Sequence, residues 1–238
     1  MSNIIAIDTA MSACSVALSR QGIVTVLREH KPRQHIQLIL PMIDELLKQS
    51  CLSIRDIDAI GFSQGPGSFT GLRIGMGVVQ GLAFGGDIQV VPVSTLQVMA
   101  QVAIDRDMLN MDGIVMPVID ARMDEVYWGI YKNNDGGAQP VCVDALNTPE
   151  QVSISGHAPG ITDNIDIGVG DGWRFRDRIS VQVELVDEQL VSDAEQVLEL
   201  SVDRYARGLS VVIDQIEPLY LRNQISWKKR PRLRKPTH

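Results

Sequence analysis

Two aspartates at the ends of two similar apolar segments are the residues best placed for chemistry. Asp8 lies in Ala6-Ile7-Asp8-Thr9-Ala10, and Asp120 lies in Val118-Ile119-Asp120-Ala121-Arg122. Two carboxylates at facing strand ends could hold a magnesium ion and orient a water for phosphoryl transfer. A phosphate also needs backbone N–H groups in the following turn, usually at glycine. Neither turn contains glycine, and Asp124 and Glu125 would repel phosphate. The sequence therefore favours a structural role for both carboxylates, as caps of turn amides.

Two glycine-rich loops are further candidates for binding an anion or a nucleotide. The first, Gly65-Pro66-Gly67-Ser68-Phe69-Thr70-Gly71, lies between an expected strand and an expected helix, whose first N–H groups can hold an anion. It lacks the lysine of a P-loop, and its third glycine is one position late for a dinucleotide fingerprint. A tight turn with Thr70 as N-cap is favoured. The second loop, Gly168-Val169-Gly170-Asp171-Gly172, could pass beneath an adenine, although such a loop is more often a plain turn.

Histidine and cysteine spacing argues against a metal centre and against a disulfide framework. The four histidines include no pair spaced i, i+3 or i, i+4 and no His-Glu-x-x-His, so a zinc peptidase is not expected. Three widely spaced cysteines without Cys-x-x-Cys indicate a reducing compartment. The first apolar run has no basic leader, and the longest uncharged stretch, 88–104, contains Pro92 and polar residues. We expect a cytoplasmic protein with no membrane span.

Charge is unevenly distributed along the chain. The net charge is −7, yet residues 226–238 carry six Lys or Arg and no acid. The preceding residues hold 16 basic and 29 acidic side chains. This acidic body disfavours wrapping around nucleic acid, because phosphate contacts need cations. The basic tail is expected to be solvated and disordered, and it could alternatively touch RNA or an acidic partner.

Hydrophobic periodicity predicts the elements that position these residues. A hairpin signal at Gly22 joins two of the first three strands, and Pro41 predicts a kink or a late start of the first helix. Strands alternating with helices after a meander imply a mixed sheet covered by helices. The similar starts around Asp8 and Asp120 indicate a duplicated domain. The second half has fewer helices than the first. The expected strands are 4–9, 13–19, 23–28, 57–63, 90–93, 114–119, 126–132, 166–169 and 181–186, and the expected helices are 34–49, 70–84, 95–103 and 192–207.

Two of the expected helices have unusual surfaces. Helix 70–84 and its flanks carry Gly71, Gly75, Gly77, Gly81 and Gly85, and each interior glycine costs about 1 kcal/mol relative to alanine. Glycines four residues apart make a smooth face that another backbone can approach, either the chain's own sheet or a partner helix. Helix 34–49 is apolar on two faces, one of which the sheet cannot cover. One face carries Ile36, Ile39, Ile43 and Leu47, and the other carries Leu38, Met42 and Leu46. We therefore predict a partner helix.

Several motifs together resemble the TsaB family, also called YeaZ. The most specific block is Gly65-Pro66-Gly67-Ser68-Phe69-Thr70-Gly71-Leu72-Arg73-Ile74-Gly75. The resemblance covers nearly the whole chain and is weakest over 133–187. The other matching motifs are Ala6-Ile7-Asp8-Thr9-Ala10, Cys14-Ser15-Val16-Ala17-Leu18, His35 with Leu40-Pro41, Val93-Ser94-Thr95-Leu96, Asp120-Ala121-Arg122, Glu125-Val126-Tyr127, Gly170-Asp171-Gly172-Trp173, Glu217-Pro218-Leu219-Tyr220-Leu221-Arg222 and Trp227-Lys228-Lys229.

The resemblance implies an α/β fold of two ribonuclease-H-like lobes, as in actin, Hsp70 and sugar kinases (the ASKHA fold), with mixed sheets flanked by helices. The implied division is an N-terminal lobe at 1–104, a C-terminal lobe at 105–225 and a basic tail at 226–238.

The resemblance also implies a function. Family members support formation of N6-threonylcarbamoyladenosine at position 37 of tRNA, where the related subunit TsaD transfers the threonylcarbamoyl group and the ATPase TsaE joins them. TsaD-type proteins hold a metal with a His-x-x-x-His pair, which this chain lacks. We therefore expect a non-catalytic subunit that binds and activates or stabilises TsaD and reaches tRNA through the complex. No cofactor is expected for the isolated chain, and ATP or ADP with magnesium only in the complex.

The resemblance places pairing, with TsaD or with a second copy of the chain, on the two unusual helices. The implied partner-binding residues are Ile36, Ile39, Ile43, Leu47, Gly71, Ile74, Gly75, Val78, Gly81, Leu82 and Gly85. A vestigial nucleotide cleft would hold Asp8, Thr9, Asp120, Gly170 and Gly172. The alternative function is an ATPase or kinase of the same fold that uses Asp8 and Asp120. The older description of such proteins as glycoproteases (peptidase M22 family) finds no supporting residues here.

Overall fold

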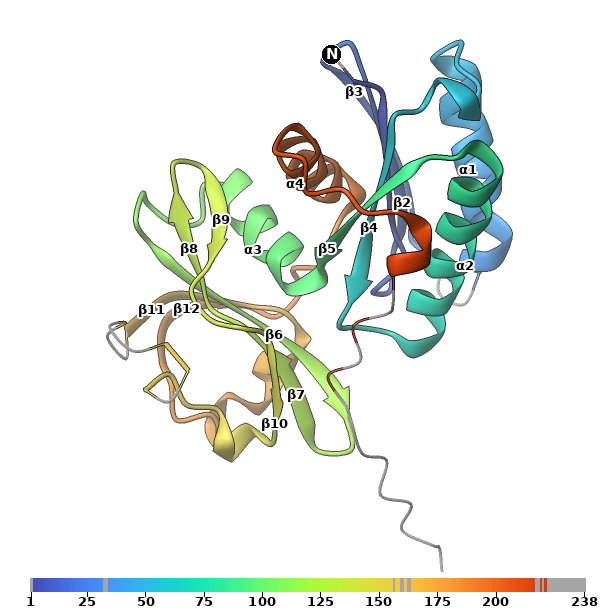
Figure 1. Cartoon of the computed structure of the whole chain (residues 1–238). Helices are drawn as coiled ribbons and strands as arrows, with labels where there is room; N and C mark the ends of the chain where they lie inside the picture. The colour runs from blue at the N-terminus through green and yellow to red at the C-terminus, as the bar shows by residue number, and fades with distance from the viewer. Residues whose placement is uncertain are drawn as a thin grey trace, which may run out of the picture.

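The chain forms two β-sheets that lie side by side (Figure 1). The computed structural model describes residues 2–31, 34–155, 157–158, 161, 164–216, 219 and 221. The first sheet has the strand order β3-β2-β1-β4-β5, in which β1 is antiparallel to β2 and parallel to β4. Its strands are β1 (Ile4–Asp8), β2 (Cys14–Arg20), β3 (Ile23–Glu29), β4 (Ala59–Gly65) and β5 (Gln89–Ser94).

The second sheet repeats this plan with more strands. Its order is β10-β7-β6-β11-β12, with β8 paired to β6 and β9 paired to β8, and β6 is antiparallel to β7 and parallel to β11. The predicted strand 126–132 is divided at Gly129, where a Cβ would lie 2.5 Å from Oδ1 of Asp144. The strands are β6 (Ile114–Arg122), β7 (Glu125–Trp128), β8 (Tyr131–Asn134), β9 (Gly137–Pro140), β10 (Ala145–Asn147), β11 (Asn164–Val169) and β12 (Gln182–Asp187). The predicted two-lobed ASKHA architecture is confirmed.

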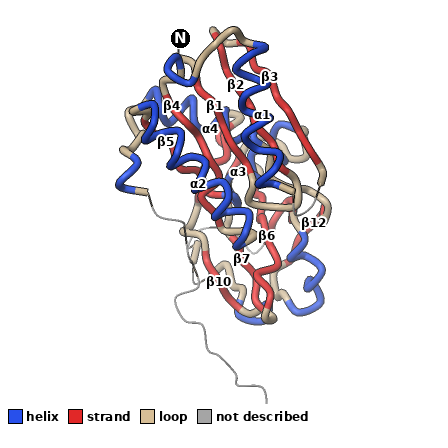
Figure 2. Tube along the Cα trace, turned by 90° about the vertical axis from the view of Figure 1, so that its right-hand side faces the viewer, coloured by secondary structure: helices blue, strands red, loops and turns tan. Residues whose placement is uncertain are grey.

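Helices α1 (His35–Gln49) and α2 (Phe69–Gly86) cover one face of the first sheet. Both lie in front of its strands in Figure 2. Strand β1 is buried along its whole length because both of its faces are covered: Ile5 and Ile7 pack in the cluster with α1 and α2, whereas Ile4 and Ala6 face the opposite side. Helix α1 starts at His35 and continues through Pro41, so the late start predicted from this proline is wrong.

The remaining two helices are exchanged between the halves of the chain. Helix α3 (Thr95–Asp105) follows the first sheet but contributes Leu96, Met99 and Ala103 to a core with the second sheet. Helix α4 (Ala194–Ala206) follows the second sheet but packs against β1, β2, β4 and β5 of the first. The predicted division between residues 104 and 105 separates the strands of the two sheets, while α3 and α4 pack across it. The predicted tail, 226–238, lies outside the described residues.

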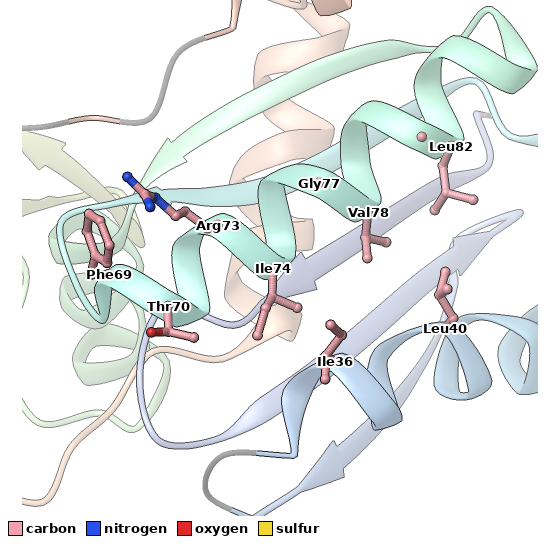
Figure 3. Close-up of a pocket in the computed structure, with 10 residues that line it drawn as sticks. Ile36, Leu40, Phe69, Thr70, Arg73, Ile74, Gly77, Val78 and Leu82 are labelled. Carbon is pink, nitrogen blue, oxygen red and sulfur yellow. The ribbon is translucent and has the colours of Figure 1, made fainter.

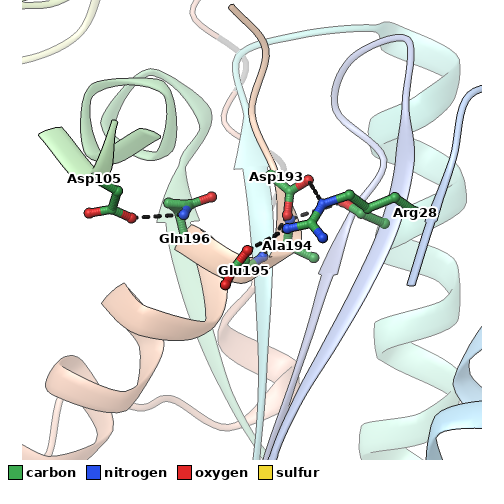
Figure 4. Close-up of polar contacts among 7 residues, drawn as sticks. Arg28, Asp105, Asp193, Ala194, Glu195 and Gln196 are labelled. Carbon is green, nitrogen blue, oxygen red and sulfur yellow. Dashed lines mark hydrogen bonds and ion pairs between the residues drawn. The ribbon is translucent and has the colours of Figure 1, made fainter. Parts of the chain in front are cut away.

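Polar contacts at the start of α4 fasten it to the first sheet and to α3 (Figure 4). Asp193 caps the helix by accepting the Glu195 N–H at 2.9 Å, and Nε of Arg28 on β3 lies 2.6 Å from Asp193 Oδ2. A second guanidinium nitrogen of Arg28 pairs with Glu195. The Gln196 amide donates to Asp105 of α3 at 2.7 Å. These contacts join the two halves where they meet.

On its other face the second sheet is covered by short segments rather than by long helices. The 3₁₀ segment η3 (Asp171–Arg178) places Trp173 against β6, and Val152 and Ile154 pack in the same cluster. This agrees with the expectation of fewer helices in the second half. Within the described part of the chain, no helix has the length and hydropathy needed to cross a membrane.

Candidate functional site

An open apolar groove lies between α1 and α2. Its volume is about 630 Å³. Figure 3 shows Ile36 and Leu40 of α1 directed toward the side chains of α2. Ile36 is 67% exposed, Leu40 51% and Phe69 58%, which are high values for such side chains. The lining residues are Ile36, Leu40, Phe69, Thr70, Arg73, Ile74, Gly77, Val78, Gly81 and Leu82.

Helical periodicity explains which apolar residues of α1 reach the groove. Ile36 and Leu40 are four residues apart and share the outer stripe. Ile39 and Ile43 are 0% and 2% exposed and belong to the core under the first sheet. Their predicted place on a partner-binding face is therefore wrong. Leu47 is partly buried against the same core and does not line the groove.

The glycines of α2 divide into two groups with different surroundings. A Cβ on Gly71 would lie 2.0 Å from the Thr9 carbonyl oxygen, and one on Gly75 would lie 2.4 Å from Thr9 Oγ1. These two glycines serve close packing inside the lobe, so their predicted partner-binding role is corrected. A Cβ on Gly77, Gly81 or Gly85 would meet no atom of the described residues within 4 Å.

Only part of the predicted set lines the groove. Ile36, Ile74, Val78, Gly81 and Leu82 line it, whereas Gly85 lies open beyond it. Sequence reasoning missed five lining residues. Counting from Gly81 back by four reaches Gly77 and Arg73, and counting from Ile36 forward by four reaches Leu40, so the helical period could have found three of them. The missed residues are Leu40, Phe69, Thr70, Arg73 and Gly77.

One end of the groove carries a cation. The guanidinium carbon of Arg73 lies 3.7 Å from the centre of the Phe69 ring, a cation–π contact that fixes both side chains at the start of α2. The N-cap of α2 is Ser68, whose hydroxyl accepts the Gly71 N–H at 3.3 Å. Thr70, predicted as the cap, lies inside the first turn instead.

A second hollow, a cleft of about 980 Å³, lies between the two lobes. Asp120 is the only one of the five predicted nucleotide-cleft residues that lines it. The lining residues are Ala10, Met11, Ser12, His35, Gly67, Ser68, Phe69, Thr70, Ile119, Asp120, Ala121, Arg122, Met123, Tyr127, Asp171, Glu188, Gln189, Leu190 and Val191.

The carboxylate of Asp120 is held by cationic side chains. Its Oδ2 lies 2.9 Å from a guanidinium nitrogen of Arg122 and 2.8 Å from one of Arg174. Its Oδ1 accepts the backbone N–H of Arg122 at 2.9 Å. Two guanidinium groups at one oxygen neutralise the negative charge that a magnesium ion would require.

The carboxylate of Asp8 is buried and does not line the cleft. Asp8 is 2% exposed, and its Oδ1 accepts the Ala10 N–H at 2.8 Å. Its Oδ2 and the hydroxyl oxygens of Ser63 and Ser192 are buried and make no regular hydrogen bond. Burial raises the pKa of Asp8, and the neighbouring Ser192 hydroxyl, the Ala10 N–H and the Ser63 hydroxyl oppose this rise. The predicted role of Asp8 as a cap of a turn amide agrees with this geometry.

The glycines proposed for an adenine contact serve close packing on β6 instead. A Cβ on Gly170 would lie 2.5 Å from the Val118 carbonyl oxygen, and one on Gly172 would lie 2.6 Å from Val118 Cγ1. Gly170 also has φ of 101°, a conformation that favours glycine. Neither glycine lines the cleft between the two lobes.

These contacts do not fit a bound nucleotide with magnesium. Asp8 is buried and engaged with its own turn, and Asp120 is paired with two arginines. In the described part of the chain, no group of three or more His, Cys, Asp or Glu side chains is arranged to hold a metal ion.

Asparagine at position 8 is expected to stabilise the chain at neutral pH. Because burial raises the pKa of Asp8 from its ordinary value of 3.8, the folded chain keeps a proton that the unfolded chain has lost. The contribution of Asp8 to the free energy of unfolding is therefore greatest in acid. It falls as pH rises from the ordinary pKa of 3.8 to the raised pKa of the folded chain. Asp8→Asn cannot ionise and retains the oxygen that caps Ala10. We expect a gain of about 1–3 kcal/mol at pH 7, the cost of a poorly satisfied buried group.

Urea unfolding of wild type and Asp8→Asn across the acid-to-neutral range checks this expectation, with Asp58→Asn as the exposed control. The two stabilities should converge in acid. A variant that is less stable than wild type at pH 7 would contradict the assignment.

Comparison with known proteins identifies the family. The TsaB protein (tRNA threonylcarbamoyladenosine biosynthesis protein) of Escherichia coli K12 is 40% identical over 237 residues, which cover 96% of this chain and 98% of that protein. Its counterpart in Haemophilus influenzae is 37% identical, covering 96% and 97%. The chain belongs to the TsaB family. A crystal structure described as an uncharacterised protein with similarity to peptidase YeaZ, from Pseudomonas aeruginosa, and one described as YeaZ from the same organism each match with a TM-score of 0.85 and 40% identity, covering 93% of this chain and 100% of theirs.

A family model also matches the chain. The model described as TsaD, tRNA N6-adenosine threonylcarbamoyltransferase, matches residues 18–176. This range contains α1, α2 and the whole groove. The chain therefore matches this family model over the segment that forms the groove.

Proposed function

We propose that this chain is an accessory, non-catalytic subunit in the synthesis of N6-threonylcarbamoyladenosine on tRNA, and that TsaD docks in the groove between α1 and α2. The groove is the main support for this proposal. A partner that covers the exposed apolar side chains of the two helices removes them from water, which stabilises the complex. The relatives' role in threonylcarbamoyladenosine biosynthesis supports the pathway.

The shared segment supports TsaD as the occupant. The TsaD family model matches this chain across both groove-forming helices, from which we infer that a TsaD chain carries counterparts of α1 and α2. Two such helix pairs can meet face to face in a four-helix arrangement, as in an isologous dimer. The open positions at Gly77 and Gly81 allow a partner helix to come close. A second copy of this chain offers the same face and competes for it.

The state of the carboxylates supports a non-catalytic role. Asp8 and Asp120 are engaged with Ala10, Arg122 and Arg174, and neither is left to orient a water. In this proposal the chemistry, and any ATP, ADP or magnesium, belong to the complex, which TsaE joins and through which the chain meets tRNA.

Sedimentation equilibrium of the chain with TsaD from the same organism tests the docking. We expect a one-to-one heterodimer that forms at the expense of any homodimer. Calorimetry with ATP and magnesium on the isolated chain is the second arm, and we expect no heat of binding. Failure to associate with TsaD would contradict the proposal, and stoichiometric ATP binding that Asp8→Asn abolishes would favour the kinase alternative.

A further inference from the structure

The start of α2 is fastened to the turn that follows β1. The Ser68 N–H donates to the Ala10 carbonyl oxygen at 2.7 Å. The Thr9 hydroxyl donates to the Gly71 carbonyl oxygen at 2.8 Å. Asp8 holds the same turn through the Ala10 N–H at 2.8 Å. Two neighbouring residues, Thr9 and Ala10, therefore contact the N-cap and the first turn of one helix, and Asp8 holds the turn to which they belong.

Gly67, just before α2, and Gly71 and Gly75 on α2 lie close to this turn. A Cβ would lie 2.4 Å from the Ala10 carbonyl oxygen at Gly67, 2.0 Å from the Thr9 carbonyl oxygen at Gly71 and 2.4 Å from Thr9 Oγ1 at Gly75. Thr9 is 3% exposed, so its side chain is enclosed at this contact. The glycines therefore let Thr9 lie directly against the helix backbone over about one helical turn.

Gly71 and Gly75 make the contact, whereas Gly77 and Gly81, where a Cβ would meet no described atom within 4 Å, line the groove. The residues that line the groove begin in the same first turn and continue along the helix to Leu82. Because a helix moves largely as a rigid rod, a shift at Gly71 displaces the lining residues Ile74 and Val78 relative to Ile36 on α1. The position of the first turn thus sets the shape of the groove.

We propose that the turn Asp8–Ala10 is a latch that sets the position of α2, and that Thr9 is a positioning residue for partner docking. The turn that could receive phosphate in a nucleotide-binding relative of this fold is used here to seat a docking helix. The inference rests on the proposed docking of TsaD in the groove, and it assigns to Thr9 a role that acts through α2.

Two substitutions at Thr9 separate its hydroxyl from its bulk. Thr9→Val keeps the shape and removes the hydrogen bond to Gly71, whereas Thr9→Ser keeps the hydroxyl. Thr25→Val on β3, at a partly buried site away from α2, is the matched control. We expect Thr9→Val to weaken TsaD binding about three- to tenfold, the range for one uncharged hydrogen bond. Thr9→Ser should restore binding to within about twofold.

Amide hydrogen exchange of the free chain provides a readout that needs no partner. In Thr9→Val, the amides of residues 72–78 should exchange faster, while those of α1 and of the second sheet stay unchanged. A pair of alanine substitutions adds a compensation test. Gly75→Ala alone should weaken binding, and it should cost little more in the Thr9→Ala background, because that change removes the atom at 2.4 Å.

The outcomes distinguish the latch from the docking site. If wild type binds TsaD and Thr9→Val binds equally well with unchanged exchange in α2, the latch is overturned while docking stands. If wild type does not bind TsaD, the proposed function fails, and faster exchange in α2 alone would support only the structural half of the latch. Equal losses from Thr9→Val and Thr25→Val would also overturn the inference.

Discussion

Leucine in place of Gly81 is expected to abolish association with TsaD without harming the fold. Gly81 lines the groove, and a Cβ there would meet no atom of the described residues within 4 Å. The larger side chain therefore causes no clash inside the chain, but it occupies the space that a partner helix would enter. Leucine also removes a helical glycine, which favours α2 by about 1 kcal/mol. The variant should be as stable as wild type or more stable.

The expected loss of TsaD binding in Gly81→Leu is large enough to test where the docking surface lies. Blocking the centre of a helix-packing interface is expected to weaken binding about a hundredfold or more, as for hot-spot positions. Calorimetric titration with TsaD measures it, and thermal unfolding checks the fold. Gln80→Leu is the control, because Gln80 is exposed on the same helix and does not line the groove. Wild-type affinity in Gly81→Leu would place the docking surface elsewhere.

The second large effect is expected at Trp173, on stability. Trp173 is 1% exposed, and its Nε1 donates to the Met116 carbonyl oxygen at 3.0 Å. Its ring lies against Gly168, where a Cβ would come within 2.4 Å of it. Trp173→Ala leaves a cavity beneath the second sheet and an unpaired carbonyl. We expect a loss of about 3–5 kcal/mol in the free energy of unfolding.

Urea unfolding followed by fluorescence and circular dichroism measures this loss. Trp173→Phe keeps much of the ring and loses only the N–H donor, so a loss of about 1–2 kcal/mol is expected. Both variants, where folded, should bind TsaD like wild type, because Trp173 is remote from the groove. A fully stable Trp173→Ala would contradict the packing role of the glycines in this loop.

The fold was predictable because its signals are local. The continuous apolar run of β1, the Gly22 hairpin and the similar starts around Asp8 and Asp120 each indicate an element from adjacent residues. The exchange of α3 and α4 was not predictable, because an apolar helical stripe indicates that a helix is buried but not which sheet buries it. Helix α3 contributes Met99 to the core with the second sheet and Val98 to the core of the first, whereas Val197 of α4 packs in the latter.

The groove was predictable in kind but not residue by residue. On α1, apolar residues occupy two faces, and only the structure separates Ile36 at the groove from Ile39 in the core. On α2, the spacing of glycines is the same whether they seat Thr9 or stay open. Asp8 accepts a hydrogen bond from the N–H of Ala10, and Asp120 forms an ion pair with Arg174. The ion pair joins distant parts of the sequence.

The central claim is that this chain supports modification by TsaD without chemistry of its own. It is tested most directly by tRNA modification in a reconstituted mixture of TsaD, TsaE and a TsaC-type synthase of the threonylcarbamoyl adduct, with and without this chain. We expect modified adenosine to form only when the chain is present, Gly81→Leu not to replace wild type, and the chain alone to modify nothing. Equal modification without the chain would contradict it.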